Sequence, residues 1–387
     1  MSQAIRRMED NPAIGLYAHI PFCQAKCSYC DFASEAGLEA LFEDYVNAMV
    51  RELETADPAR VRSVYIGGGT PTVLAPALLG RILKTIKGTF DLEPGAEVTV
   101  EANPGTVDGA GLAALRALGA NRLSLGVQSF KAGELALLGR IHNATEAIAA
   151  FGAAREAGFE KISLDLIYGL PGQGMAAWQH SLAQALSLAP EHLSLYCLSV
   201  EEGTPLAAAI RHGNLPAPDA DLAAEMYEWA EKACAQAGYH HYEISNWARE
   251  PEMACRHNLI YWRNEPYRGI GASAHSWAGG RRWANLHSPA EYVARVLAGG
   301  SPVMTEEEIG PDLEIGETVM LGLRLVEEGV TFERFQRRFD LDLRQRFGKE
   351  IKDLAAWGLL AVCTDRLRLT PRGRLLGNQV FGRFLPA

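Results

Sequence analysis

The sequence has few cysteines, and only three of them lie close together. Only seven of the 387 residues are cysteine, an odd number that a complete set of intramolecular disulfides cannot use. Cys197, Cys234, Cys255 and Cys363 are scattered along the chain. This usage is typical of a protein that works in a reducing compartment, because disulfide frameworks belong to oxidising ones. We therefore expect a cytoplasmic location.

Long hydrophobic runs and an excess of positive charge are also missing. No apolar run reaches the length that crosses a bilayer, and Met1 to Asn11 carries two arginines but no apolar signal-peptide core. The net charge of −10 argues against general binding to nucleic acid or to anionic membranes. With 48% hydrophobic and 22% charged residues the composition is globular, and the length suits two or three domains.

Three of the cysteines form the motif C-x-x-x-C-x-x-C at Cys23, Cys27 and Cys30. The motif follows a predicted strand, Gly15 to Ile20, and therefore lies in a loop. Thiolates are the usual ligands of iron–sulfur clusters. Three of them suit a [4Fe–4S] cluster whose fourth iron stays open to another ligand. Two other interpretations remain: a zinc loop with His19 as the fourth ligand, and a group of buried free thiols.

Short apolar runs alternate with amphipathic stretches over the first half of the chain. This alternation predicts parallel strands joined by helical crossovers. The expected strands are Gly15–Ile20, Val61–Ile66, Glu97–Glu101, Arg122–Gly126, Lys161–Ile167 and His192–Cys197. The expected helices between them are Leu38–Thr55, Pro76–Lys87, Gly109–Leu118, Thr145–Ala157 and Met175–Leu188. Six such units indicate an α/β fold, an open (β/α)6 relative of the eight-stranded barrel.

Polar and glycine-rich signals fall at the carboxyl ends of these strands, where barrels of this kind collect their chemistry. The segment 67–71, GGGTP, follows the second strand, and three glycines allow close approach of the backbone to a ligand. Glu101 ends the third strand and Gln128 follows the fourth. Asp165 lies inside the fifth, apolar strand, where a carboxylate requires a ligand or a partner such as Arg140.

The cysteine spacing, with an aromatic residue before the last cysteine, resembles the radical SAM superfamily. The chain resembles, nearly end to end, the HemN and HemW group of oxygen-independent coproporphyrinogen III oxidase-like proteins. The segments that carry the resemblance are YAHIPFC, GGGTPT, EANP, GVQSF, GRIH and DLIYGLPGQ. The resemblance implies a [4Fe–4S] cluster on the three cysteines and bound S-adenosylmethionine (SAM). The SAM contacts that it implies are Tyr17, Gly68, Glu101, Gln128, Arg140 and Asp165. It further implies that Gly69 and Thr70 match positions that hold a second SAM in the oxidase.

Two departures separate the chain from the oxidase. The oxidase carries a fourth cysteine two residues after the third, where this chain has Phe32. It also has a longer segment before the position of Tyr17. Both features are similar to the HemW branch, whose members are proposed to be haem chaperones.

A second motif, HNLIYW at 257–262, resembles the haem-binding motif H-N-x-x-Y-W of the HemW branch. A neutral imidazole is a common axial haem ligand, so His257 is the expected ligand, with Tyr261 and Trp262 flanking the macrocycle. Two alternatives stay open. A histidine beside aromatic residues is often a hydrogen-bonded packing residue, and Cys255 is a competing soft ligand.

The chain divides into three predicted parts: a radical SAM barrel over 1–200, an extension with the HNLIYW segment over 201–300, and a mainly helical, winged-helix-like domain over 301–387. Ser276–Ala278 and Arg281–Ala284 are expected to form a hairpin, and Tyr239–Asn246 a single strand. Acidic Glu306–Glu308 is expected near a helix start. The arginines of the final hairpin suggest nucleic-acid binding, but a solvated face is the simpler interpretation. They are Arg366, Arg368, Arg372 and Arg374.

The sequence therefore predicts a haem chaperone that binds a [4Fe–4S] cluster, SAM and haem, and that delivers haem to apo-haemoproteins, some of them membrane-associated respiratory enzymes. Coproporphyrinogen III dehydrogenase activity is the alternative, and a nucleic-acid-binding regulator is a weaker one. No nucleic-acid partner is expected. The oligomeric state stays open, with a dimer among the options.

Overall fold

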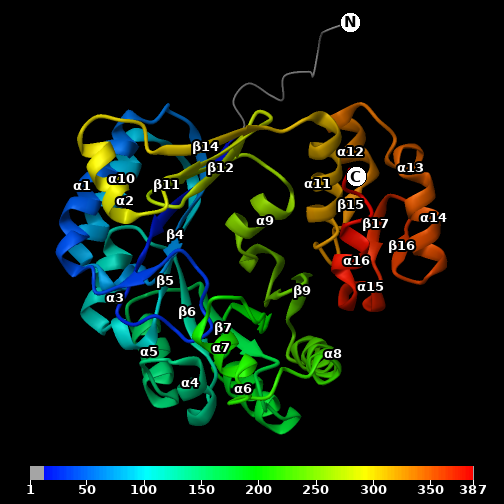
Figure 1. Cartoon of the computed structure of the whole chain (residues 1–387), viewed down its shortest axis with the longest axis horizontal. Helices are drawn as coiled ribbons and strands as arrows, with labels where there is room; N and C mark the ends of the chain where they lie inside the picture. The colour runs from blue at the N-terminus through cyan, green and yellow to red at the C-terminus, as the bar shows by residue number, and fades with distance from the viewer. Residues whose placement is uncertain (1–12, 387) are drawn as a thin grey trace, which may run out of the picture.

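A curved sheet of parallel strands forms the centre of the molecule (Figure 1). The computed structural model describes residues 13–386. Six strands run parallel in chain order, as the sequence predicted, because each is joined to the next by a helical crossover. They are β1 (Ile14–Ile20), β4 (Arg60–Gly68), β5 (Asp91–Ala102), β6 (Arg122–Gln128), β7 (Ile162–Tyr168) and β8 (His192–Cys197). The predicted open barrel is confirmed.

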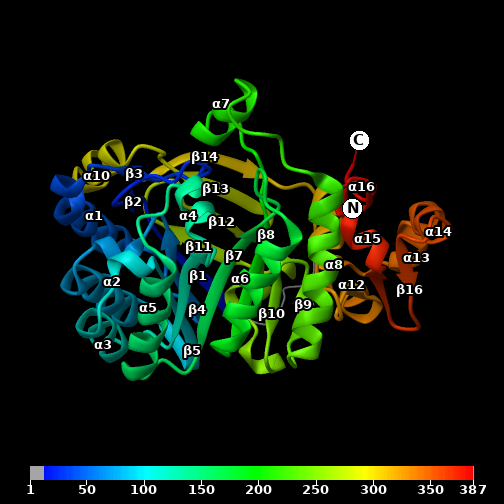
Figure 2. The ribbon, with the colours of Figure 1, turned by 90° about the horizontal axis from the view of Figure 1, so that it is seen from below.

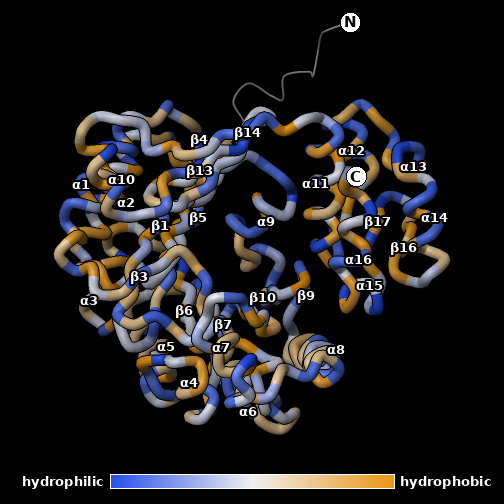
Figure 3. Tube along the Cα trace, in the orientation of Figure 1, coloured by the Kyte–Doolittle hydropathy of each residue, from blue (hydrophilic) through white to orange (hydrophobic). Residues whose placement is uncertain are grey.

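Amphipathic helices cover the outer face of the sheet. Each turns a hydrophobic side inward, as Met49 and Leu53 of α1 and Ile82 and Ile86 of α2 do, all buried in one core with the strands. Figure 3 shows hydrophobic residues recurring along these helices between hydrophilic ones. The helices are α1 (Phe42–Thr55), α2 (Pro76–Thr89), α3 (Gly109–Ala117), α4 (Ala132–Leu138), α5 (Ala144–Glu156), α6 (Met175–Ser187) and α8 (Ala220–Gln236).

The sheet continues beyond the six strands at both edges. Next to β8 lie β10 (Asn246–Ala248) and β9 (His240–Glu243). Next to β1 lie β11 (Tyr267–Ile270), β12 (His275–Ala278), β13 (Arg281–Asn285) and β14 (Val303–Glu308), with α10 (Pro289–Leu297) before the last of them. The expected hairpin is present as β12 and β13.

One local prediction in these edge segments is confirmed and one is wrong. The acidic residues Glu306–Glu308 lie near a helix start, as expected, since α11 (Pro311–Gly322) begins three residues later. They end strand β14, where antiparallel pairing sets Glu306 and Glu307 opposite Trp283 and Arg282 and brings Arg281 to Glu306. The segment 239–246 is two strands, not one. The chain turns at Ile244 and Ser245, so that β9 and β10 pair with each other.

The segment of the HNLIYW motif forms a short helix, α9 (Arg256–Trp262), which lies on the concave side of the sheet (Figure 1). It contacts β1 and β4 on one side and α11 of the C-terminal domain on the other. A second small helix, α7 (Pro205–Arg211), projects from the end of β8 (Figure 2). Its Leu206 N–H donates to the carbonyl of Ser28 in the cysteine loop at 2.8 Å. That loop is bracketed by β2 (Phe22–Cys23) and β3 (Glu35–Ala36).

The C-terminal domain has its own hydrophobic core and a winged-helix-like arrangement of helices and a small sheet. Its helices are α11 (Pro311–Gly322), α12 (Phe332–Phe339), α13 (Leu343–Arg346), α14 (Gly348–Ala356), α15 (Pro371–Leu375) and α16 (Gly377–Phe381). Its strands are β15 (Val330–Thr331), β16 (Leu360–Val362) and β17 (Arg366–Leu369). Phe347 separates α13 from α14, and Leu376 separates α15 from α16.

Three of the four arginines in and just after the final hairpin contact other groups of the protein. Arg366 pairs with Asp365 at 2.7 Å, and Arg374 pairs with Glu231 of α8 at 2.6 Å. Arg372 donates to the carbonyl of Trp357 at 3.3 Å. Two of these arginines contact carboxylates, which lowers their attraction for phosphates and disfavours the nucleic-acid interpretation.

Buried Glu243 attaches the C-terminal domain to the sheet edge. Its carboxylate accepts from the Ser245 N–H at 2.9 Å, from the Asn246 amide, and from Arg324 at 3.5 Å. A backbone bridge pairs Glu243 with Leu325. The Glu243 side chain is fully buried and Asn246 is 2% exposed, whereas the Arg324 side chain is 25% exposed. Removal of the carboxylate therefore leaves the Asn246 amide without acceptor or water, while Arg324 can still reach water.

We expect Glu243→Ala to lower the free energy of unfolding by about 2 kcal/mol, because it leaves the buried Asn246 amide, the Ser245 N–H and the partly exposed Arg324 guanidinium without their shared acceptor. Urea unfolding of the variant and the wild type measures this. Glu228→Ala, at an exposed position of α8, is the matched control and should change the free energy by less than about 0.5 kcal/mol. Equal effects of the two substitutions would contradict the attachment role.

Candidate functional site

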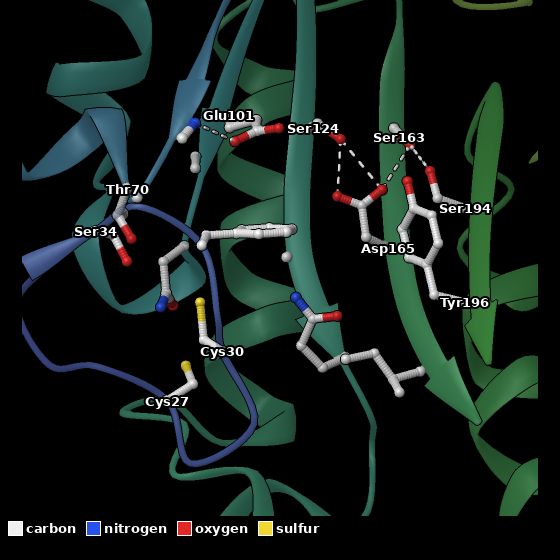
Figure 4. A pocket seen from close by; sticks show the side chains of 18 of the residues that line it. Cys27, Cys30, Ser34, Thr70, Glu101, Ser124, Ser163, Asp165, Ser194 and Tyr196 are labelled. Atoms are coloured by element: carbon white, nitrogen blue, oxygen red, sulfur yellow. Dashed lines mark hydrogen bonds between the residues drawn. The ribbon is translucent and has the colours of Figure 1, made fainter. Parts of the chain in front are cut away.

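One cavity of about 510 Å³ opens among the cysteine loop and the strand ends (Figure 4). It brings together residues that the sequence places up to 235 positions apart, from Cys23 to Asn258. Of the predicted site residues, those that line it are Cys23, Cys27, Cys30, Gly68, Gly69, Thr70, Glu101, Gln128, Arg140 and Asp165. Tyr17 and His257 are not among its lining residues.

The cysteine loop is held against α4. The Ser28 N–H donates to the Leu138 carbonyl at 3.1 Å, and the Ser28 hydroxyl donates to the Leu137 carbonyl at 2.7 Å. The Cys30 N–H donates to the Cys27 carbonyl at 3.3 Å, which makes a tight turn between two of the thiols. The three cysteines are only partly exposed and line the same cavity. A donor set of three thiols at one cavity fits a cluster with an open iron.

His19 has a different task from the one that a zinc loop would require. Its Nε2 hydrogen-bonds the Ala33 carbonyl at 2.9 Å and its Nδ1 the Tyr17 hydroxyl at 3.0 Å. Burial lowers its pKa, so the ring is neutral. Both ring nitrogens are therefore engaged in fastening the end of the cysteine loop to β1.

The glycine turn after β4 allows the closest backbone approach in the site. Gly68 has φ of +117°, a conformation that favours glycine. A Cβ on Gly69 would meet the Phe22 carbonyl oxygen at 2.5 Å and the Cys23 sulfur at 3.0 Å. The Gly69 and Thr70 N–H groups donate to the carbonyls of Ile20 and Phe22 at 2.8 and 2.7 Å. The turn thus packs directly against the first cysteine.

Glu101 is a buried carboxyl group with two donors. Its Oε1 accepts from the Tyr65 hydroxyl at 2.6 Å, and its Oε2 accepts from the Gly68 N–H at 3.2 Å. Burial raises its pKa to about 7, although the Tyr65 hydrogen bond opposes the rise; Asp165 adds to it. The group can therefore exchange a proton near neutral pH, and its carboxylate can accept hydrogen bonds from a ligand.

Arg140 reaches over the cavity toward the cysteine loop. Its guanidinium donates to the Cys27 sulfur at 3.2 Å and to the Gly126 carbonyl at 2.7 Å. Among the described residues its buried Nε has no hydrogen-bond partner. Gln128, also in the cavity, has φ of +67°, an uncommon conformation for a residue other than glycine. An unpartnered donor and a strained backbone at one cavity fit a ligand-binding role.

Asp165 is partnered by serines and not by Arg140, which corrects one of the two options from the sequence. Ser124 of β6 donates to the carboxylate at 2.9 Å and Ser163 of β7 at 3.1 Å. A further hydrogen bond from Ser194 of β8 also lowers the Asp165 pKa, but burial dominates and raises it. Figure 4 shows the three serines around the carboxylate.

Sequence reasoning missed these serines and Tyr65. Ser124, Ser163 and Ser194 stand at polar positions within apolar strands, and the parallel register sets Ser124 beside Ser163 and Asp165 beside Ser194. A buried hydroxyl in an apolar strand needs a hydrogen-bond partner, and that requirement was the available signal. Tyr65 gave no such signal, because aromatic residues are common in strands.

His257 is buried, with 1% of its surface exposed. Its Nδ1 hydrogen-bonds Ser63 Oγ at 2.9 Å and its Nε2 the Tyr261 hydroxyl at 3.0 Å. Burial lowers its pKa to about 3, so the imidazole is neutral. Neutral imidazole is the form that ligates iron, but in this conformation both nitrogens are occupied.

The rest of the motif divides between two surroundings. Cys255 and Asn258 line the cavity from its α9 side, and burial raises the pKa of the Cys255 thiol to about 12. Trp262 faces the C-terminal domain, where the Arg324 guanidinium lies 4.3 Å from the centre of its ring. Tyr261 and Trp262 thus do not share a face that could flank a macrocycle in this conformation.

We expect Gly69→Ala to lower the iron and sulfide content after anaerobic cluster reconstitution, because the new Cβ would displace Phe22 and Cys23. Chemical assay of both elements measures this. Gly133→Ala in α4 is the control, since its Cβ would meet nothing within 4 Å among the described residues. Full cluster content in the Gly69 variant would contradict the close-approach argument.

Two family models match the chain. The radical SAM superfamily model covers residues 17–185, and the HemN C-terminal domain model covers residues 311–376. The first match contains all three cysteines of the loop and five of the six parallel strands, from β1 to β7. The second lies within the winged-helix-like domain.

Relatives align over nearly the whole chain. The heme chaperone HemW of Bacillus subtilis is 39% identical over 378 residues, which cover 95% of this chain and 98% of that protein. The heme chaperone HemW of Mycobacterium tuberculosis is 40% identical, covering 95% and 93%. A mitochondrial radical S-adenosyl methionine domain-containing protein 1 of Mus musculus is 36% identical, covering 96% and 87%.

A solved structure shares the whole fold. The coproporphyrinogen III oxidase HemN of Escherichia coli superposes with a TM-score of 0.83 at 26% identity, covering 97% of this chain and 90% of that one. None of the helices within residues 13–386 combines the length and hydrophobicity that spanning a bilayer requires. The cysteine loop, the cavity at the strand ends and the end-to-end identity together place the chain in the HemW family of radical SAM proteins.

Proposed function

We propose that this protein is a haem chaperone that holds a [4Fe–4S] cluster and SAM at the mouth of the barrel, binds haem and delivers it to apo-haemoproteins. The observation that carries the proposal is the alignment over 95% of the chain with a relative named heme chaperone. The exposed Phe32, where the oxidase has a cysteine, supports it.

Cys23, Cys27 and Cys30 are the proposed cluster ligands. When bound, the cluster supplies one-electron chemistry and an open iron for the amino and carboxylate groups of SAM. The cavity fits such cofactors, since it joins three thiols, an unpartnered Arg140 Nε and a glycine turn.

The remaining cavity residues have roles that follow from their chemistry. The Arg140 guanidinium suits the SAM carboxylate, since it binds carboxylates with paired donors. Glu101 suits ligand hydroxyl groups as an acceptor, and Gln128 offers both a donor and acceptors. Asp165, with Gly68, Gly69, Thr70 and Tyr17, completes the proposed set. Tyr17 is outside the cavity lining, so its part would be indirect or through its backbone.

Haem is the proposed cargo, and His257 its proposed ligand. Because both nitrogens of His257 are hydrogen-bonded in the core, ligation requires α9 to release Ser63 or Tyr261 first. That release costs one buried hydrogen bond, roughly 1 kcal/mol. The Cys255 thiol, on the cavity side of α9, is the competing ligand.

Coproporphyrinogen III dehydrogenase activity is the second candidate. The superposition with the oxidase over 97% of the chain favours it, whereas Phe32 in place of the fourth cysteine disfavours it. Sustained SAM-dependent conversion of coproporphyrinogen III to protoporphyrinogen by the reconstituted protein would replace the chaperone proposal with this one.

We expect an anaerobic haem titration of the cluster-loaded protein to show saturable, roughly stoichiometric binding that His257→Ala weakens at least about tenfold, because an axial bond is lost. Absorbance measures the binding. Cys255→Ala is the matched variant and should bind as the wild type does. Weakening by Cys255→Ala alone would move the ligand to the thiol, and binding that never saturates would contradict the chaperone proposal.

We expect Cys27→Ala to abolish the iron–sulfur absorbance after anaerobic reconstitution, because two thiolates cannot retain the cube. The far-ultraviolet circular dichroism should stay unchanged. Cys363→Ala, in the C-terminal domain, is the control and should reconstitute fully. A complete cluster in the Cys27 variant would show that the ligand assignment is wrong.

A further inference from the structure

A continuous line of contacts joins the HNLIYW helix to the cavity. The His257 imidazole lies nearly parallel to the Tyr65 ring, with centroids 5.2 Å apart and an angle of 28° between the planes. The Tyr65 hydroxyl donates to Glu101 at 2.6 Å, and Glu101 accepts from the Gly68 N–H at 3.2 Å. Three contacts therefore connect α9 with the glycine turn beside the cysteine loop.

Tight packing leaves Tyr65 little alternative. A Cβ on Gly67 would meet the Tyr65 ring at 2.8 Å and the Glu101 carboxyl carbon at 2.9 Å, so only glycine leaves room for both. The Tyr17 ring stacks on Tyr65 with centroids 6.2 Å apart. His257 and Tyr17 thus both pack against the Tyr65 ring, and His257 is the contact that comes from α9.

His257 is itself held in a fixed orientation. Ser63 on β4 and Tyr261 on α9 hydrogen-bond its two ring nitrogens. Ser63 and Tyr65 belong to the same strand, two residues apart, so they point to the same face of the sheet. The imidazole is therefore hydrogen-bonded to β4 through Ser63, and it stacks on Tyr65, the next residue on the same face of that strand.

We propose that His257 is a positioning residue for the SAM site, acting through Tyr65 to hold the Glu101 carboxylate in place. The inference rests on the proposed function for the presence of a SAM site. It assigns the HNLIYW helix a task that does not depend on haem ligation. It also implies that withdrawal of His257 toward a haem would loosen Glu101, so that the two sites would be coupled.

The test is a double-mutant cycle on SAM affinity, measured by equilibrium dialysis with the full, cluster-loaded, haem-free chain. We expect His257→Ala and Tyr65→Phe each to weaken SAM binding roughly three- to tenfold, the value of one positioned hydrogen bond. The two effects should not add, either with each other or with Glu101→Gln, since all three residues act in one line. Ile260→Val, a buried change on the same helix, is the control and should leave the affinity unchanged.

The pH profile of SAM affinity supplies a readout that a packing role would not move. The groups that act on Glu101 are Tyr65, Asp165 and the Gly68 N–H, with Tyr17, Tyr196 and Tyr261 nearby. The Glu101 pKa is about 7 in the haem-free fold, and the carboxylate is the binding form. The affinity should therefore rise with pH through about 7 in the wild type.

Tyr65→Phe removes the hydrogen bond that lowers the Glu101 pKa, so it should move this midpoint upward. His257→Ala should move it in the same direction, and His257→Gln, which keeps a donor for Ser63, should restore part of the change. Additive losses of SAM affinity, with no change in the pH midpoint of its rise, would overturn the positioning role. Absence of SAM binding by the wild type would overturn the SAM site as well, and haem titration of the same sample would then test the chaperone proposal separately.

Discussion

The site depends on one constraint, the parallel register of six neighbouring strands. Because parallel strands end at the same edge, residues that follow them meet there whatever their distance in sequence. Glu101, Gln128 and Asp165 come from three successive strands. The cysteine loop after β1 and the glycine turn after β4 then close on the same edge. The curvature of the sheet turns these ends toward one cavity.

The buried acidic groups of the site need hydrogen-bond partners. The inner faces of β6, β7 and β8 carry hydroxyl groups that satisfy Asp165, while Tyr65 and the Gly68 N–H satisfy Glu101. A buried carboxyl group is tolerated only when its lone pairs have such partners. The raised pKa values of both groups follow from the same burial. Neutral hydrogen-bond donors thus orient the carboxyl groups of Glu101 and Asp165, and neither carboxyl group is in direct contact with an arginine or a lysine among residues 13–386.

Helix α9 packs between the sheet and the C-terminal domain. Arg263 pairs with Glu328 at 2.6 Å, and Arg338 donates to the Asn264 carbonyl at 2.8 Å. At its other end the helix presents His257 to β4. Because the C-terminal domain contacts one end of α9 and β4 contacts the other, a shift of the domain can be transmitted to the site through this helix. This arrangement offers the C-terminal domain a physical route to the barrel interior.

The sequence by itself determined the strand order, the helices that alternate with the strands, the cysteine loop and the positions of Glu101, Gln128, Arg140 and Asp165. Periodicity and spacing are local properties, and the strand order follows from them because a helical crossover joins each strand to a parallel neighbour. Only the tertiary structure decided which partners the buried groups take. The serines around Asp165, the Tyr65 hydroxyl on Glu101 and the enclosure of His257 all depend on register between distant segments. Charge pairing across strands likewise decided that Glu306–Glu308 extend a sheet, because an acidic run has no strong preference of its own until arginines lie opposite it.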